Sequence, residues 1–217
     1  MRFKQKESIS PDDLRKAIYL IDSYRAHLFY DISWIDKRVK EGKLGNRFKV
    51  RWKKLRKVMI KMASISNEIA GVRKLAKIQN YLEASWQIIV PLIVLIAFLS
   101  VLAPQSFSLI KGTTVYLTVI AFSSIILGLV GRFIIGWKIG RKIEEHFLKN
   151  PEAHEFKIYE VRNAVQLLID ELRKFLKESN QNPSKHRIGL NFMDYKYVKM
   201  VKKPKPWRKY YIAEIIV

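Results

Sequence analysis

The chain has 217 residues and no cysteine, with 41 lysines and arginines against 19 acidic residues, which gives a formal net charge of +22. The lack of cysteine excludes disulfides, thiolate metal sites and a cysteine nucleophile. A net charge of this size is larger than solubility requires, and it predicts that the protein attracts polyanions from its own compartment.

The first helix is predicted to begin near Ser10. This serine is a good N-cap, Pro11 suits the first helical position, and two aspartates follow in the first turn. Apolar residues then recur at helical spacing until Gly42 and Gly45 interrupt the chain. We therefore expect one helix over residues 10–41.

A second helix is expected from residue 46. Its apolar positions alternate spacings of three and four, which is typical of coiled-coil packing. This seam would pair either with the 10–41 helix or with another subunit. The alternation in RFKVRW, residues 47–52, permits a short strand instead. The seam consists of Leu55, Val58, Met62, Ile65, Ile69 and Val72.

Eleven of the 21 residues from 37 to 57 are basic, and Glu41 is the only acidic one. Such a cluster predicts a surface for a polyanion, either nucleic acid bound through its phosphates or the anionic lipid leaflet. An ordinary solvated helix face is the simpler alternative. No zinc-finger, RNP or KH-type motif accompanies the cluster. The predicted polyanion-binding residues are Lys37, Arg38, Lys40, Arg47, Lys49, Arg51, Lys53, Lys54, Arg56 and Lys57.

Two long apolar runs predict an integral membrane protein. Residues 86–103 and 112–131 contain no charged side chain, and runs of about 18 to 20 such residues match a hydrocarbon core of roughly 30 Å. Buried core helices are the alternative, but these are usually shorter and keep a polar stripe. We place the spans at about 86–103 and 112–132, joined by a short loop into an antiparallel hairpin. The polar, charged start of the chain does not resemble a cleaved signal peptide.

The distribution of charge predicts the orientation of this hairpin. The region before Trp86 has 21 lysines and arginines against 9 acids, and the region from Lys138 onward has 18 against 10. The connecting loop contributes only Lys111. The positive-inside bias therefore places both termini on the cytoplasmic or equivalent interior side.

The helices are expected to extend beyond the spans. No strong stop lies between Val72 and the first span, where we expect Pro91 to be accommodated as a kink. The second helix should run over residues 113–149. Asn150 and Pro151 then open a further helix. Its predicted apolar stripe consists of Ile158, Val161, Val165, Leu168, Leu172 and Phe175.

Two further groups of residues are predicted around the spans. Aromatic and basic residues mark the inner membrane interface, and small residues four apart allow close helix packing, within the hairpin or between copies. The interface residues are Trp86, Arg132, Trp137, Lys138, Arg141 and Lys142. The packing residues are Ser124, Gly128, Gly136 and Gly140.

The tail is predicted to form a β-hairpin. Residues 195–201 and 209–217 are rich in β-branched and aromatic side chains, and KKPKPWR lies between them. The apolar C-terminal strand is expected at an edge. It would pair either with a strand of a partner or fold back on the helices.

Position along the chain favours nucleic acid as the polyanion. If residues 46–86 form one helix, the basic cluster lies about 45 to 60 Å from the bilayer, which is several Debye lengths of about 8 Å. Anionic lipid would then be out of reach. A reversal of the chain at Gly71 would remove this argument.

No catalytic motif is present: HExxH, Walker A, Rossmann and GxSxG patterns are all missing, so we expect no enzyme, cofactor or metal site. The predicted fold is an all-α integral membrane protein with a two-span hairpin, long helices that extend into an interior bundle, and a small C-terminal β-hairpin. Its predicted regions are residues 1–85 (basic, helical or coiled-coil), 86–137 (membrane hairpin), 138–180 (interior helices) and 181–217 (β tail).

The predicted function is that of a structural, membrane-anchored subunit of a homo-oligomer or multi-protein assembly, such as a scaffold or a virion or envelope component. Its basic interior face would bind a polyanion, with nucleic acid preferred, without sequence specificity. The alternative is an oligomeric channel or an insertase-like translocation factor built from several hairpins. A channel would normally show ionisable groups within its spans, and these runs have none.

Overall fold

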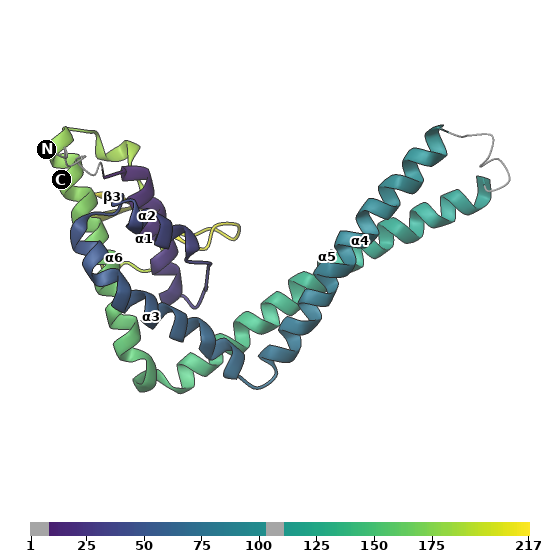
Figure 1. Cartoon of the computed structure of the whole chain (residues 1–217), viewed down its shortest axis with the longest axis horizontal. Coiled ribbons are helices and arrows are strands. Elements are labelled where there is room, and N and C mark those ends of the chain that lie inside the picture. Colours follow the sequence, from purple (N-terminus) through teal and green to yellow (C-terminus); the bar gives the residue numbers. More distant parts are fainter. Residues whose placement is uncertain (1–8, 103–110) are drawn as a thin grey trace, which may run out of the picture. The chain divides into compact units, whose positions relative to one another are not determined.

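The computed structural model describes residues 9–102 and 111–217 of the chain. The chain divides into two compact units, one made of Met1–Ile65 and Phe147–Val217, the other of Ser66–His146. The first unit is a helical domain with a small sheet, and the second is a pair of long helices (Figure 1). A mostly helical chain with a small β region is therefore confirmed.

The first helix begins as predicted. α1 spans Pro11–Arg25, and the hydroxyl of Ser10 accepts a hydrogen bond from the amide of Asp13 at 3.3 Å. This bond satisfies one of the amides that have no partner within the first turn of a helix.

The expectation of one helix over residues 10–41 is wrong, because the chain turns after α1. His27 adopts a left-handed backbone with a φ of 58°, and the amide of Leu28 donates back to the carbonyl of Ser23 at 2.9 Å. This closure ends the helix. The chain resumes as α2, Ser33–Lys40. Apolar periodicity continued across the turn and concealed it.

The basic segment is helical, so the alternative of a strand at residues 47–52 is wrong. It belongs to α3, Asn46–Glu68. The buried face of α3 begins at Phe48, one heptad before the predicted seam, and uses Met59 where Val58 was expected. This face packs into the core of its own unit. Its residues are Phe48, Trp52, Leu55, Met59, Met62 and Ile65.

α3 and α4 are separate helices. Gly71 has a φ of +82°, a conformation that side chains with a Cβ rarely adopt. α4, Val72–Leu102, starts directly after it and contains Pro91, so a helix that continues into the first apolar run is confirmed. A single helix over residues 46–86 is wrong, and the distance argument that favoured nucleic acid over lipid is lost with it.

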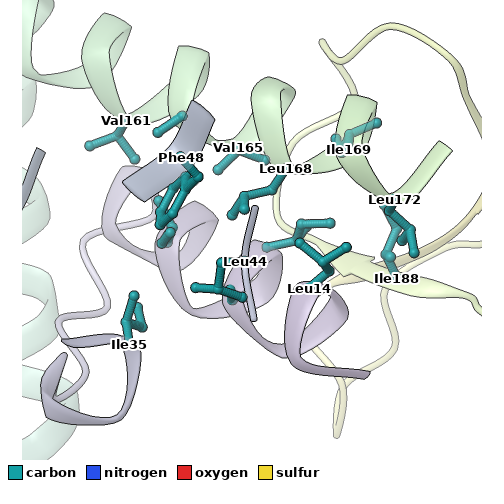
Figure 2. Close-up of a cluster of buried hydrophobic side chains, with 14 of the residues drawn as sticks. Leu14, Ile35, Leu44, Phe48, Val161, Val165, Leu168, Ile169, Leu172 and Ile188 are labelled. Carbon is teal, nitrogen blue, oxygen red and sulfur yellow. The ribbon is translucent and has the colours of Figure 1, made fainter. Parts of the chain in front are cut away.

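α6, Pro151–Ser179, forms the other wall of the core. Its predicted stripe is confirmed: Val161, Val165, Leu168 and Leu172 are fully buried, and the two end positions pack against the core. Figure 2 shows the four buried side chains of this stripe facing Leu14 of α1, Phe48 of α3 and Ile188 of the sheet.

The tail forms three strands where two were predicted. β1 (Ile188–Leu190), β2 (Val198–Lys202) and β3 (Tyr211–Ile215) make an antiparallel sheet in the order β1-β3-β2. The C-terminal strand is thus central, and the prediction that it forms an edge is wrong. Ala213 and Ile215 are buried, so the strand folds onto its own helices. The sequence did not predict β1, because three residues are too few to show the alternation of apolar and polar side chains that marks a strand.

The second unit contains all of α4 and most of α5, Lys111–Lys149, and the two helices run antiparallel. α5 continues without interruption to the predicted stop before Pro151. The predicted connection, residues 104–111, lies outside the described residues except for Lys111, which begins α5.

Candidate polyanion-binding surface and long apolar helices

The predicted basic residues lie on the solvent side of α2 and α3. All ten are exposed except Arg38, which is half-buried. No acidic residue occurs between Glu41 and Glu68, so α3 is acid-free until its final residue. The first unit as a whole contains 33 lysines and arginines against 15 acids. On α3, therefore, no acidic residue of the same helix balances the cations before its last position.

Three of the ten cations are engaged by acids of the same unit. Arg38 contacts the carboxylates of Asp13 at 3.2 Å and Glu41 at 2.7 Å. Arg56 contacts Asp36 at 2.9 Å.

Lys54 is the third cation that an acid of the same unit engages. Its ammonium lies 2.8 Å from the carboxylate of Glu160 of α6. These pairs join neighbouring elements and leave the cations less available to a ligand. Arg38, Lys54 and Arg56 are therefore removed from the predicted set of polyanion-binding residues.

The cations left for a ligand lie on one flank and on the outward side of α3. Among the described residues, no ion pair engages Arg47, Arg51, Lys53 or Lys57. With 3.6 residues per turn, Arg47 and Arg51 flank one side of the stripe, whereas Lys53 and Lys57 point outward, away from the core. A rod-like polyanion could contact them from more than one side.

The apolar residues between these cations have divided roles. Phe48 is fully buried and Trp52 is 5% exposed, whereas Val50 is 82% exposed. The indole of Trp52 also donates to Asp36 at 2.8 Å. The two aromatic rings therefore serve the core and offer no stacking platform for bases, so any nucleic acid would be held by its phosphates alone.

One segment of the described chain is long and apolar enough to cross a membrane, Ser123–Lys149 on α5, with a mean hydropathy of 1.4. None of its most apolar window is buried. Its exposed side chains include Phe133 at 77% and Leu127 at 71%, and α4 exposes Ile88 at 70%. A contiguous apolar surface of this kind is uncommon on a protein surrounded by water.

The predicted interface residues have specific partners within the second unit. Arg132 of α5 forms an ion pair with Glu83 of α4 at 3.1 Å, so this pair links the two helices. The guanidinium of Arg141 stacks over Trp137 at 5.8 Å and contacts Glu145 at 2.8 Å. The two remaining members of this set, Lys138 and Lys142, are exposed.

Trp86 packs in the seam between α4 and α5. A Cβ built on Gly128 would lie 2.2 Å from the indole nitrogen of Trp86, so only glycine allows this approach. Among the described residues, a Cβ at Gly136 or Gly140 would meet nothing within 4 Å. Ser124 is exposed. Of the predicted packing residues, Gly128 therefore lies in the contact between the two helices.

A buried polar network joins α1 to the tail, and the sequence analysis missed it. Arg25 donates to both carboxylate oxygens of Asp194, at 2.9 and 2.8 Å, and to the hydroxyl of Tyr195 at 2.7 Å. The carboxylate of Asp22 accepts from the Tyr195 hydroxyl and from the amide of Asn191. The signal was present: Asp22 and Arg25 occupy the apolar face of α1, where charge needs a partner.

The network shifts the ionisation of its members. Burial raises the pKa of Asp22 above the ordinary value of 3.8, against the hydrogen bonds from Tyr195 and Asn191 that lower it. The hydrogen bond from Arg25 lowers the pKa of Asp194. Burial also raises the pKa of the Tyr195 hydroxyl. These groups hydrogen-bond one another within the domain, so the network attaches the tail to α1.

No group of histidine, cysteine or acidic residues with a metal-binding arrangement occurs within residues 9–102 and 111–217. Comparison with known proteins gives no family model, no curated protein and no solved structure that matches this chain.

Proposed function

We propose that this protein is a structural, membrane-anchored subunit of a larger assembly, whose basic domain binds nucleic acid without sequence specificity. The observation that carries the anchoring is the long apolar helix Ser123–Lys149, none of whose most apolar window is buried. Lipid is the environment in which such a surface costs no exposure of apolar area to water.

The division of the chain supports two crossings rather than one. Residues before 66 and after 146 share one compact unit, so the stretch between them must leave and return on the same side of a membrane. An even number of crossings satisfies this, and residues 66–146 are long enough for two spans of about 20 residues. The excess of basic residues in this unit fits the interior side.

Nucleic acid is the preferred polyanion because the free cations of α3 spread over about half the circumference of the helix. The two strands of a duplex present phosphates on both sides of a helix that enters a groove. A flat lipid surface would meet one line along the helix. A scaffold beneath a cell membrane and an envelope component that links membrane to nucleoprotein both fit this description.

The test is titration of the full chain, in nanodiscs of zwitterionic phosphatidylcholine, which has no net charge, with a random-sequence DNA duplex at several salt concentrations. We expect the logarithm of affinity to fall linearly with the logarithm of salt, with a slope of about −0.9 per phosphate contact. Replacing Arg47, Arg51, Lys53 and Lys57 by glutamate should weaken binding at least ~100-fold at low salt and flatten this slope.

A matched control carries the same charge change on the same domain: Lys177, Lys185, Lys196 and Lys199, all exposed, replaced by glutamate. It should retain most of the affinity. Absence of binding at low salt, or equal losses in the two variants, would remove the proposed α3 site.

A further inference from the structure

The connection between β2 and β3 is a second basic surface, distinct from α3. We call residues 203–210 the finger. It is acid-free, as is the whole stretch of residues 195–213, and it projects from the sheet as the yellow loop in Figure 1. Among the described residues, no ion pair engages its cations. With Lys202 at the end of β2, the basic residues are Lys202, Lys203, Lys205, Arg208 and Lys209.

The finger is a built structure. Lys205 and Arg208 exchange two backbone hydrogen bonds, of 2.8 and 2.9 Å, around a tip formed by Pro206 and Trp207. The proline ring fixes the backbone at the position where such turns favour it. The guanidinium of Arg208 then donates to the carbonyl of Lys203 at 2.7 Å and ties the base of the finger.

This turn presents a tryptophan to the outside. Trp207 is 79% exposed, more than any other aromatic residue in the described chain. The ammonium of Lys205 lies over its ring at 5.1 Å. Tryptophan at a tip contributes nothing to the core, whereas Phe48 and Trp52, the aromatic residues of the other basic segment, are buried. Of the two basic surfaces of the first unit, α3 and the finger, only the finger therefore offers an exposed indole.

We propose that the finger binds the anionic surface of the lipid bilayer, with Trp207 at the level of the headgroups and the surrounding lysines beside lipid phosphates. An indole is apolar along one edge and donates a hydrogen bond from the other, which suits this interface. Each lysine near an anionic leaflet strengthens contact about fivefold. A single exposed ring could stack on only one base, so nucleic acid explains the finger less well.

The proposal rests on the membrane anchoring proposed above, because anchoring supplies a high effective concentration of lipid and makes a weak contact sufficient. It adds a second, peripheral attachment that would restrain the basic domain against the bilayer.

Because the chain has no cysteine, single reporters can be placed without background. A fluorophore on Lys209→Cys, beside Trp207, would report finger contact through quenching by nitroxide lipids in nanodiscs. Reporters on Leu127→Cys of α5 and Val50→Cys of α3, both exposed, would report the anchor and the other basic surface. Discs of pure phosphatidylcholine and discs with added phosphatidylglycerol would be compared.

We expect the finger reporter to be quenched in anionic discs and not in neutral ones. Trp207→Ala should reduce the quenching. Lys202→Glu, Lys203→Glu and Lys205→Glu together should lower the equilibrium constant for contact between the finger and lipid more than 100-fold. The loss of each lysine accounts for about fivefold, and the reversal of its charge adds to this. Circular dichroism should stay unchanged in Trp207→Ala, since the side chain is exposed.

The reporters separate the ways of failing. Quenching at Leu127 without quenching at Lys209 would overturn the finger proposal and leave the anchor intact. No quenching at Leu127 would overturn the anchor and the finger together. Equal quenching at Val50 would show attraction of the whole domain, and a finger signal that responds only to added DNA would show nucleic acid; either result would overturn a specific lipid contact.

Discussion

At the scale of single residues, the tail is held by charges that are buried on α1. Arg25 is only 8% exposed, and its guanidinium is shared between Asp194 and Tyr195. Leaving a buried cation without its partner costs more than the pair itself contributes. The attachment of the C-terminal sheet therefore depends on a few hydrogen bonds as well as on apolar packing.

Asp194→Asn should lower the free energy of unfolding by about 1 to 2 kcal/mol at neutral pH, less than for a fully buried pair because the carboxylate is 42% exposed. Urea unfolding of the detergent-purified protein, followed by tryptophan fluorescence, would measure it. The pKa of Asp194 is lowered in the folded state, so its contribution is complete well above 3.8 and is lost as pH falls through the lowered value.

The difference between native protein and Asp194→Asn should therefore be constant at neutral pH and shrink in acid. The raised pKa of Asp22 acts in the opposite direction, but it is present in both proteins and cancels to first order. Asp12→Asn is the control, because its pair with Arg15 is 80% exposed at the carboxylate. Equal effects of the two substitutions would contradict a special role for the network.

At the scale of elements, α3 serves two purposes on opposite sides. Its buried stripe continues the core of α1 and α6, while its solvent side carries the acid-free cluster of cations. The helical period separates the two sets because apolar residues recur at spacings of three and four. Aromatic residues next to cations in the sequence are thus not neighbours in function.

Phe48→Ala should cost about 3 to 5 kcal/mol of unfolding free energy, since it removes a fully buried ring from the core. Val50→Ala, two residues away and 82% exposed, should change it by less than about 0.5 kcal/mol. Urea unfolding would again provide the measurement. A small effect of Phe48→Ala would mean that the ring is available to a ligand and that α3 is packed differently.

At the scale of the whole molecule, the chain forms its first unit from its two end segments and its second unit from the segment between them. The first unit takes residues from both sides of the long helical pair, so folding of the domain requires α6 to return to α1. A hairpin with two crossings allows this, and a single crossing would separate the halves of one core.

Single-cysteine variants should test this topology in intact cells with a membrane-impermeant maleimide. Lys40→Cys and Lys185→Cys, both exposed in the first unit, should react only after permeabilisation. Gln105→Cys, in the predicted connection between the spans, should react without it. Opposite behaviour of Lys40→Cys and Lys185→Cys would contradict two crossings.

The sequence by itself determined the elements whose signals are local or long. The cap at Ser10, the stop before Pro151, the apolar stripe of α6 and the long apolar helices follow from capping, proline geometry and periodicity, which act within a few turns. The concentration of cations on α3 is likewise a property of composition. The predicted role of these cations in binding a polyanion, and the two membrane spans, stay predictions.

Tertiary structure decided what depends on residues far apart in the chain. His27 ends α1 through a left-handed turn that no glycine announced, and Gly71 divides two helices that periodicity had joined. The place of β3 between β1 and β2, and the partners of Arg25, depend on which segments meet after folding. Arg25 and Asp194 are 169 positions apart, and the strands pair in an order that differs from their order in the chain. The energy of such contacts has no counterpart in the local pattern of the sequence.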